Sequence, residues 1–318
     1  MLPVRTQINI KMKSRLLHFV IIFSWLSGAF FTGGGPVHCS TLSAELQDDM
    51  IIIRIDGKTF TCYRFGEGQK YPYFYPVNGP LSGISVTTES SLPYPHHRSL
   101  FFGLDRVNGG NYWQEGNDRG RIVSAGPRIL VNGPENVVIE DECAWKQPDA
   151  EPIIIDRRII TIAAPSDSLR SIEFSIVLTA RTDIRVDKTN HSLFSARMDP
   201  ALSVEQGGVL VNAGGGRNQE GTLDQKSPWC DYYGVRFGVT EGLAIFDSPG
   251  NPWHPSPWLT RNYGFFSPTP MNLLDENGFS LKKDETLKLM YRVIIHGGTT
   301  EQAGIKGLYD EWSESVSK

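Results

Sequence analysis

The sequence predicts an all-β fold, an antiparallel β-sandwich that ends in one C-terminal α-helix. Short segments rich in Val, Ile and Thr recur along the 318-residue chain, with no helical periodicity between them. Turn-forming pairs separate these segments, among them Asp56-Gly57, Asn108-Gly109 and Asn277-Gly278. Only the stretch after residue 298 carries apolar residues at helical spacing.

The clearest predicted strand covers residues 286–296, where Leu287, Leu289 and Tyr291 alternate with Lys288 and other residues. One face is apolar and the other mixed, which is typical of a half-buried strand. The other predicted strands cover residues 50–55, 82–89, 127–131, 136–140, 153–163, 171–180, 233–239 and 242–246. Two polar segments rich in Gly and Pro, 141–152 and 213–228, are predicted to be loops.

The predicted helix follows Gly297-Gly298. Thr299 is a suitable N-cap, and Gln302 three residues later completes a capping box. Apolar residues then recur at helical spacing, namely Ile305, Leu308, Tyr309, Trp312 and Val316. We expect this helix to pack its apolar face on the sandwich, and we predict a single domain over residues 45–318.

The first 40 residues predict an export signal. Lys11, Lys13 and Arg15 precede an apolar run over residues 16–31, and small residues lie near its end. The run has 16 residues, fewer than the roughly 20 that a membrane-spanning helix needs. The alternative is an uncleaved N-terminal anchor. We expect an exported protein, periplasmic or extracellular, with no membrane span beyond this N-terminal segment.

The charge balance argues against nucleic acid as a partner. The chain has 31 Lys and Arg residues against 35 Asp and Glu residues, a net charge of −4. Four of the basic residues precede Glu45, the first acidic one; without them 27 basic residues face 35 acidic ones, and the net charge is −8. Proteins that bind nucleic-acid phosphates normally carry a basic excess.

Three cysteines remain beyond the N-terminal segment, Cys62, Cys143 and Cys230. Their wide spacing matches neither a disulfide framework nor a C-x-x-C zinc site. Two interpretations stay open: one disulfide of unknown pairing, or three buried free thiols.

The densest group of reactive residue types lies at 94–103, where His96, His97 and Arg98 follow Pro95. Histidine suits proton transfer near neutral pH, and arginine suits recognition of carboxylates and hydroxyls. We predict that His96 and His97 are catalytic and that Arg98 binds substrate. The alternative is a buried polar cluster that holds a loop in place.

Three further segments, 108–115, 190–197 and 251–264, combine aromatic rings, His and Arg. Aromatic platforms beside polar groups suit the apolar faces and hydroxyls of sugars, and three prolines restrict the backbone of the last segment. The predicted catalytic residue is His254, and the predicted substrate-binding residues are Asn108, Trp113, His191, Arg197, Trp258, Arg261 and Tyr263. The alternatives are an ordinary turn around Trp113 and an apolar cover over one end of the sandwich.

Metal binding is not indicated by residue spacing. We therefore predict no metal ligands and no cofactor, although His96, His97, His191 and His254 would suffice for a divalent metal if the fold brought them together.

Together these segments resemble the PmoA-like family, whose members often carry the label "methane oxygenase PmoA". The resemblance covers roughly residues 50–297 and rests on 72–77 (PYFYPV), 95–100 (PHHRSL), Val107-Asn108-Gly109 with Trp113, His191-Ser192-Leu193 with Arg197, and Asn251-Pro252, Trp258, Arg261 and Tyr263-Gly264. It implies a β-supersandwich related to galactose-mutarotase-like carbohydrate enzymes. The family pattern Asp-His-Pro-His-His-Arg departs here, because Pro93-Tyr94 precedes Pro95 and the leading His is absent.

Three functions follow as hypotheses. The first is a secreted carbohydrate-active enzyme, a hydrolase, lyase or epimerase, in which a His is the general acid or base and Trp113 or Trp258 stacks on a sugar ring. The second is a noncatalytic carbohydrate-binding module of the cell envelope, because no pair of catalytic carboxylates is recognisable. The third is a metal-dependent oxygenase, as the family label suggests.

Overall fold

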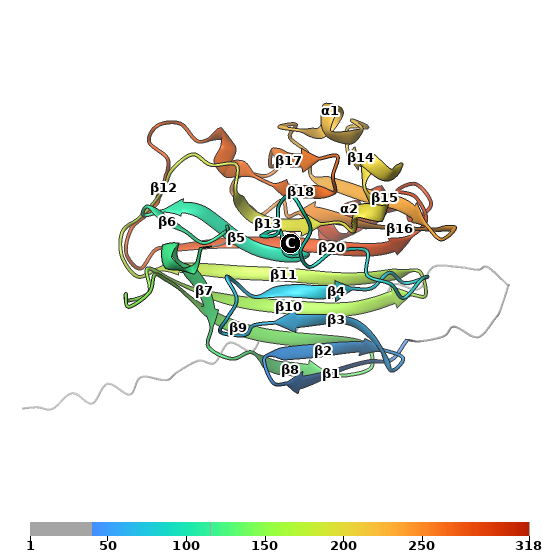
Figure 1. Cartoon of the computed structure of the whole chain (residues 1–318), viewed down its shortest axis with the longest axis horizontal. Coiled ribbons are helices and arrows are strands. Elements are labelled where there is room, and N and C mark those ends of the chain that lie inside the picture. The colour runs from blue at the N-terminus through green and yellow to red at the C-terminus, as the bar shows by residue number, and fades with distance from the viewer. Residues whose placement is uncertain (1–39, 115, 318) are drawn as a thin grey trace, which may run out of the picture. The chain divides into compact units, whose positions relative to one another are not determined.

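Two antiparallel β-sheets form the body of the protein (Figure 1). The computed structural model describes residues 40–114 and 116–317. The predicted signal peptide or anchor therefore lies outside the described residues, apart from Ser40. No helix within the described ranges is both long and apolar enough to cross a membrane.

The described residues contribute eleven strands to the first sheet. Its main path has the order β1-β2-β3-β4-β5-β13-β18-β17, and β6, β12 and β19 pair beside it. The strands are β1 (Leu42–Gln47), β2 (Met50–Ile55), β3 (Lys58–Arg64), β4 (Tyr73–Val77), β5 (Leu100–Val107), β6 (Gly110–Asn111), β12 (Ile184–Val186), β13 (Ser192–Arg197), β17 (Trp258–Arg261), β18 (Phe265–Pro268) and β19 (Phe279–Leu281).

The second sheet has nine strands within the described residues, in the order β14-β15-β16-β20-β11-β10-β9-β7, with β8 also paired to β9. They are β7 (Arg121–Ser124), β8 (Arg128–Asn132), β9 (Asn136–Lys146), β10 (Ile154–Ser166), β11 (Leu169–Ala180), β14 (Val209–Asn212), β15 (Trp229–Arg236), β16 (Val239–Asp247) and β20 (Thr286–Gly297).

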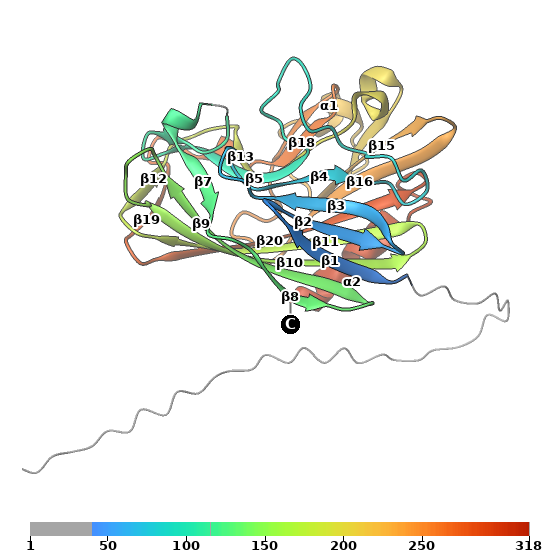
Figure 2. The ribbon, with the colours of Figure 1, turned by 60° about the horizontal axis from the view of Figure 1, so that its bottom comes forward.

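Alternate side chains of the two sheets meet in the space between them, where Figure 2 shows the sheets as two layers. The Phe194 ring of β13 stacks on the Tyr291 ring of β20, with centroids 5.2 Å apart and planes 13° apart. Phe102 of β5 lies 5.8 Å from Phe174 of β11. The predicted antiparallel sandwich with a C-terminal helix is confirmed.

Helix α2 (Ile305–Val316) packs on the outer face of the second sheet. Its Tyr309 and Trp312 rings lie 5.4 Å and 5.9 Å from Phe246 of β16. The predicted capping-box bonds also form, because Thr299 and Gln302 each bond the other's backbone N–H. They close a separate turn, however, since the left-handed Gly304 follows it and the helix begins only at Ile305.

The predicted strand at 82–89 is wrong. Its backbone makes only isolated bridges, at Ser85 and Thr87. Side chains take the bonds that a ladder would use: the Ser85 hydroxyl contacts the backbone of Val77 and Thr87, and the buried Glu241 carboxylate accepts bonds from the backbone N–H groups of Leu81 and Ser82. Such local bonds compete with regular pairing.

Two predicted boundaries are also corrected. The loop predicted at 141–152 begins later, because β9 continues to Lys146 with Asp141, Cys143 and Trp145 facing inward. The strand predicted at 233–239 is a hairpin, since Phe237 and Gly238 both have positive φ and form the two-residue turn between β15 and β16. The predicted loop at 213–228 contains the short helix α1 (Asn218–Thr222).

The three cysteines in the described residues are buried free thiols. Burial raises the pKa of each thiol above its usual value. Of the two interpretations left open by the sequence, the structure shows the second.

A polar network lies between the sheets. Arg158 of β10, fully buried, donates from Nε and Nη2 to the Asp156 carboxylate at 2.7 and 2.9 Å. Trp145 donates from Nε1 to the same carboxylate at 2.6 Å. The Tyr63 hydroxyl of β3 donates to Asp141 of β9 at 2.7 Å and so joins the two sheets. Burial alone would lower the pKa of Arg158, but Asp156 raises it well above its usual value.

A second buried contact fixes the segment between β20 and α2. His296 of β20 lies with Nε2 2.9 Å from the Asp231 carboxylate of β15, and the Thr300 hydroxyl donates to the other oxygen at 2.6 Å. Burial lowers the pKa of His296, yet Asp231 outweighs that effect, so its pKa is raised.

We predict that Arg158→Met lowers the free energy of unfolding by roughly 3–5 kcal/mol, because it leaves the Asp156 charge buried without its partner. The neighbouring Arg157→Met is the control, and we expect it to cost less than about 1 kcal/mol, because Arg157 is exposed and Arg128 still pairs with Glu140. Urea denaturation followed by Trp fluorescence measures both. Equal losses in the two variants would contradict the prediction.

We also predict a pH-dependent contribution from His296. Since its pKa is raised on folding, its stabilisation is fully present below about pH 6.5, the unfolded value, and is lost as pH rises through the folded pKa. The difference in unfolding free energy between the parent and His296→Asn should therefore shrink as pH rises. Thr300→Val, which removes a neutral donor, should give a difference that changes little over the same range.

Candidate functional site

The candidate site lies on the outer face of the first sheet, away from the second sheet. Side chains alternate along a strand. Phe194 points into the sandwich, so Arg197, three residues later on β13, points outward. On β18, Phe266 packs against Tyr232 of the second sheet, and Phe265 therefore faces outward.

The loop between β4 and β5 covers this face beside β18 (Figure 2). It places the His97 ring on Phe265, with centroids 4.1 Å apart and planes 27° apart. The His96 ring meets His97 edge-on at 4.5 Å. Burial, together with the neighbouring His96, Arg197, His191 and Arg261, lowers the pKa of His97 to about 2. His97 is therefore neutral at physiological pH, and its Nδ1 has no hydrogen-bond partner.

Arg197 is the most unusual residue of the site. Its side chain is 1% exposed, and its Nε and Nη1 are buried without partners. Only Nη2 makes a bond, a long one of 3.4 Å to the Leu92 carbonyl. The guanidinium lies 4.3 Å from the centre of the Tyr263 ring. Burial lowers its pKa, which shows the cost of this unpaired charge.

A tight hairpin presents Arg261 and Tyr263. β17 and β18 pair through Arg261 and Phe265, so three residues form the loop. Gly264 closes it with φ of 103°, and its carbonyl accepts a 2.7 Å bond from the Met198 backbone N–H. This left-handed position favours glycine. The hairpin holds the half-buried Tyr263 ring against Arg197 and leaves Arg261 partly exposed.

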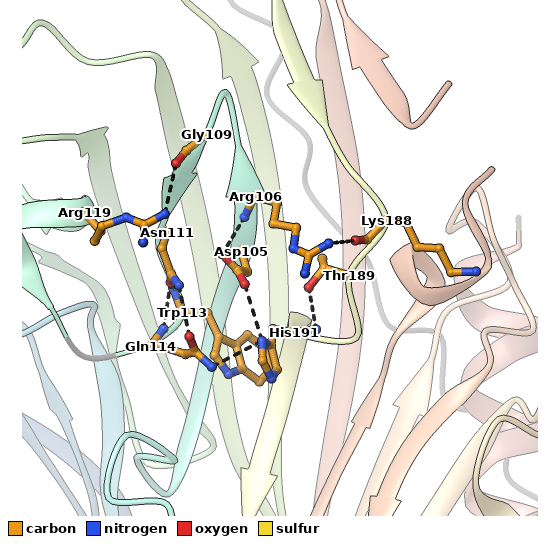
Figure 3. Close-up of polar contacts among 10 residues, drawn as sticks. All are labelled: Asp105, Arg106, Gly109, Asn111, Trp113, Gln114, Arg119, Lys188, Thr189 and His191. Carbon is orange, nitrogen blue, oxygen red and sulfur yellow. Dashed lines mark hydrogen bonds and ion pairs between the residues drawn. The ribbon is translucent and has the colours of Figure 1, made fainter. Parts of the chain in front are cut away.

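A histidine–aspartate pair forms the other part of the site (Figure 3). His191 Nδ1 lies 3.4 Å from the Asp105 carboxylate and 3.4 Å from the Gln114 side-chain amide. The Trp113 ring stacks on the imidazole at 5.9 Å. Burial raises the pKa of Asp105, but the bond to His191 and the backbone N–H of Arg106 outweigh it, so the pKa is lowered. Asp105 is thus ionised at neutral pH.

Gly103 of β5 explains why Trp113 lies so close to the sheet. A Cβ at this position would lie 2.7 Å from the Tyr112 carbonyl oxygen, which is too close for any side chain. The missing side chain lets the 111–114 backbone cross directly over β5. Trp113 is fully buried as a result, and its Nε1 donor has no partner.

Several predicted residues therefore come together and others do not. The His97 ring contacts His96, Tyr263 and Phe265. Trp113 contacts Phe265 and His191, and Arg197 contacts Tyr263. Arg261 pairs with Phe265 across the β17–β18 hairpin. Arg98 is half-buried and follows His97, and its charge acts on Tyr73 of β4. We name the assembly the β13 site; its residues are His96, His97, Asp105, Trp113, His191, Arg197, Arg261, Tyr263 and Phe265.

His254 lies elsewhere. Its Nδ1 is 3.3 Å from the Asp247 carboxylate, without the alignment of a hydrogen bond, and its Nε2 lies 3.5 Å from the Tyr309 hydroxyl of α2. It belongs to the packing of the 248–257 loop against α2. The preceding Asn251 is bound to Asp247 and to the backbone of Met290, which fixes the same loop on β20.

Trp258 and Asn108 are occupied by structural contacts. Trp258 is 0% exposed and donates from Nε1 to the Ser227 carbonyl at 2.8 Å, so its ring offers no face to a ligand. Both ends of the Asn108 amide bind the backbone of another segment, at Asp183 and Arg185.

The sequence did not assign roles to Asp105 and Phe265. Asp105 faces His191 because β5 and β13 are neighbours, a pairing between residues far apart in the sequence. The strand β18 is four residues long and contains a proline, so its alternation is too short to be recognised.

The chemistry of the β13 site is that of a donor-rich, cationic surface with aromatic rings. Neither Arg197 nor Arg261 has an ion-pair partner among the described residues. Over the same ranges, no three His, Cys, Asp or Glu side chains converge as metal ligands. The arrangement can bind oxygen-rich groups and, through His191, accept or donate a proton.

Comparison with solved structures finds distant likenesses. The galactose 1-epimerase from Lactobacillus acidophilus NCFM matches with a TM-score of 0.40 and 9% identity, over 82% of this chain and 99% of that one. A galactose mutarotase related enzyme from Lactobacillus acidophilus matches with a TM-score of 0.34 and 8% identity, over 81% and 98%. At such TM-scores the likeness says nothing about activity.

Comparison of the sequence itself is more decisive. No curated protein matches it. A family of unknown function, DUF6807, matches residues 51–310, which is most of the chain. The chain therefore belongs to the DUF6807 family.

Proposed function

We propose that the β13 site binds a sugar or glycan and that a histidine of the site transfers a proton to or from it. One observation carries this proposal: three buried side chains of the site, His97, Trp113 and Arg197, keep polar atoms without partners. A buried donor or acceptor left unpaired costs roughly 1–3 kcal/mol. A ligand with several oxygens would satisfy these atoms together, and the half-buried Tyr263 ring suits the apolar face of a sugar. The Trp113 and Phe265 rings are fully buried and offer no such face.

His191 is the best-placed group for proton transfer. Nδ1 faces both the ionised Asp105 carboxylate and the Gln114 amide nitrogen, and it cannot donate to the first while it accepts from the second. In the tautomer with the proton on Nδ1, directed at Asp105, Nε2 is the proton acceptor. Asp105 is then a positioning residue that also stabilises the imidazolium once it forms. His97 suits a different role, because its pKa of about 2 makes it a neutral hydrogen-bonding partner. Its neighbour His96 reaches the same face.

Two wider features complete the proposal. The basic and apolar pattern before residue 32 supports export of the mature protein. The motifs around His96, Arg197 and Tyr263 support the relationship to the PmoA-like family. The reaction would be a hydrolysis, elimination or epimerisation of a carbohydrate, each of which needs a positioned acid or base.

A noncatalytic sugar-binding module is the second candidate. It is favoured by the contacts of Asp105, because this carboxylate of the site is bound to His191 and to the Arg106 backbone N–H. No second described carboxylate faces it to form the pair that most glycoside hydrolases use.

We predict that His191→Asn and Asp105→Asn each lower kcat on a glycan panel, the former by roughly 10²–10⁴-fold, because general acid–base catalysis contributes that much. His254→Asn is the matched control, since His254 also lies beside a carboxylate, Asp247, but packs against α2. It should retain parental turnover. Sugar binding without turnover in the parent would select the noncatalytic candidate, and equal losses in all three variants would contradict the assignment.

A further inference from the structure

We infer that the ligand of the β13 site carries a carboxylate, as a uronic acid does, and that Arg197 and Arg261 hold it. This inference rests on the proposed function and names the substrate class of the same site. It follows from the charges of the site, from the contacts that Arg197 lacks, and from the way the 90–95 segment covers it.

The first observation is the difference between Arg158 and Arg197, the two fully buried arginines of the described residues. Asp156 neutralises the charge of Arg158 in an ion pair that includes two hydrogen bonds. Arg197 is as deeply buried yet leaves Nε and Nη1 without partners. A charge taken out of water without a counter-charge is strongly unfavourable. A ligand with a negative charge would supply the partner that the Arg197 guanidinium lacks.

The second observation is the sign of the charge on the side chains around Arg197. Arg261 is partly exposed, and among the described residues its guanidinium makes one hydrogen bond, from Nη1 to the Thr260 carbonyl. The nearest acidic influence on Arg197 comes from Glu205, which is exposed and forms no ion pair with it. Two guanidinium groups without counter-ions therefore face one area. A carboxylate matches their fork of donors better than a neutral hydroxyl does.

The third observation concerns how a ligand would reach the Arg197 guanidinium. Residues 90–95 lie over Arg197, and the Leu92 carbonyl contact of 3.4 Å is their bond to it. Otherwise this tip makes local bonds, from Ser90 to the Pro95 carbonyl and from the His97 backbone to the Tyr94 carbonyl. Leu92 is 85% exposed. Displacing residues 90–95 would break the ring contacts of Tyr94 with His97 and Tyr263, at 5.3 and 5.2 Å, and one long hydrogen bond. It would make three guanidinium nitrogens of Arg197 available to a bidentate ligand.

The test is a calorimetric titration of the full mature chain with D-galacturonate and D-glucuronate, with their neutral parents D-galactose and D-glucose, and with acetate. We expect the uronates to bind roughly 10- to 100-fold more tightly than the neutral sugars, the range given by charged hydrogen bonds. Acetate, which lacks the hydroxyls, should bind more weakly than the uronates.

Three variants locate the effect. Arg197→Met and Arg261→Met should each remove most of the preference for uronates. Arg185→Met, an exposed arginine paired with Asp187, is the matched control and should keep it. Arg197→Met should also leave the unfolding midpoint unchanged or raise it, unlike Arg158→Met, because it removes an unpaired buried charge. A fall in the midpoint as large as that of Arg158→Met would show a structural role and overturn the inference.

The outcomes separate the inference from the proposed function. Equal binding of uronates and neutral sugars would overturn the carboxylate while keeping the sugar site. Equal binding of acetate and uronates, lost in Arg197→Met, would support the carboxylate and overturn the sugar. No binding of any of the five compounds would overturn both.

Discussion

The ion pair between Arg158 and Asp156 is the contact on which the interior of this sandwich depends. It places two opposite charges between the sheets, and every donor that faces Asp156 is used. The adjacent bond from Tyr63 to Asp141 joins one sheet to the other. Buried polar groups need hydrogen-bond partners, and in this space these groups supply them to one another.

The outer face of the first sheet shows the opposite arrangement. There the polar atoms of His97, Trp113 and Arg197 are buried and unmatched. Single buried atoms without partners also occur elsewhere, such as the Thr61 and Ser192 hydroxyls, but here three neighbouring side chains share this state, at a stability cost of several kcal/mol by the usual magnitudes. Unfavourable local arrangements of this kind concentrate at functional sites. The contrast with the paired Arg158 therefore supports the proposal that a ligand completes the β13 site.

Sequence reasoning identified most of the fold and part of the site. Long strands such as β10, β11 and β20 show their alternation over 12 or 13 residues and were predicted within a few residues. Strands of three to five residues such as β17, β18 and β19 carry too few alternations to be seen, and polar side chains in β9 concealed buried positions.

For the site residues too, the sequence was informative where the signal is local and uninformative where it depends on distant strands. His96, His97 and Arg197, which the structure brings together, were predicted from segments that combine His, Arg and aromatic residues. His254, Arg261 and Tyr263 share one segment, 251–264, yet this segment passes from the second sheet to the first, so its members serve different surfaces. The pairing of His191 with Asp105 depends on which strands are neighbours, and a local pattern does not contain that information.

The adjacency of β5 and β13 also bears on the order of folding. Ser192 pairs with Leu104 and Ala196 with Leu100, across 88 and 96 residues of chain that include strands β7 to β11 of the second sheet. Closing so long a loop costs entropy before any contact is gained, and topologies rich in such pairings fold slowly. The β13 site therefore comes into existence only when the chain has already made its distant connections.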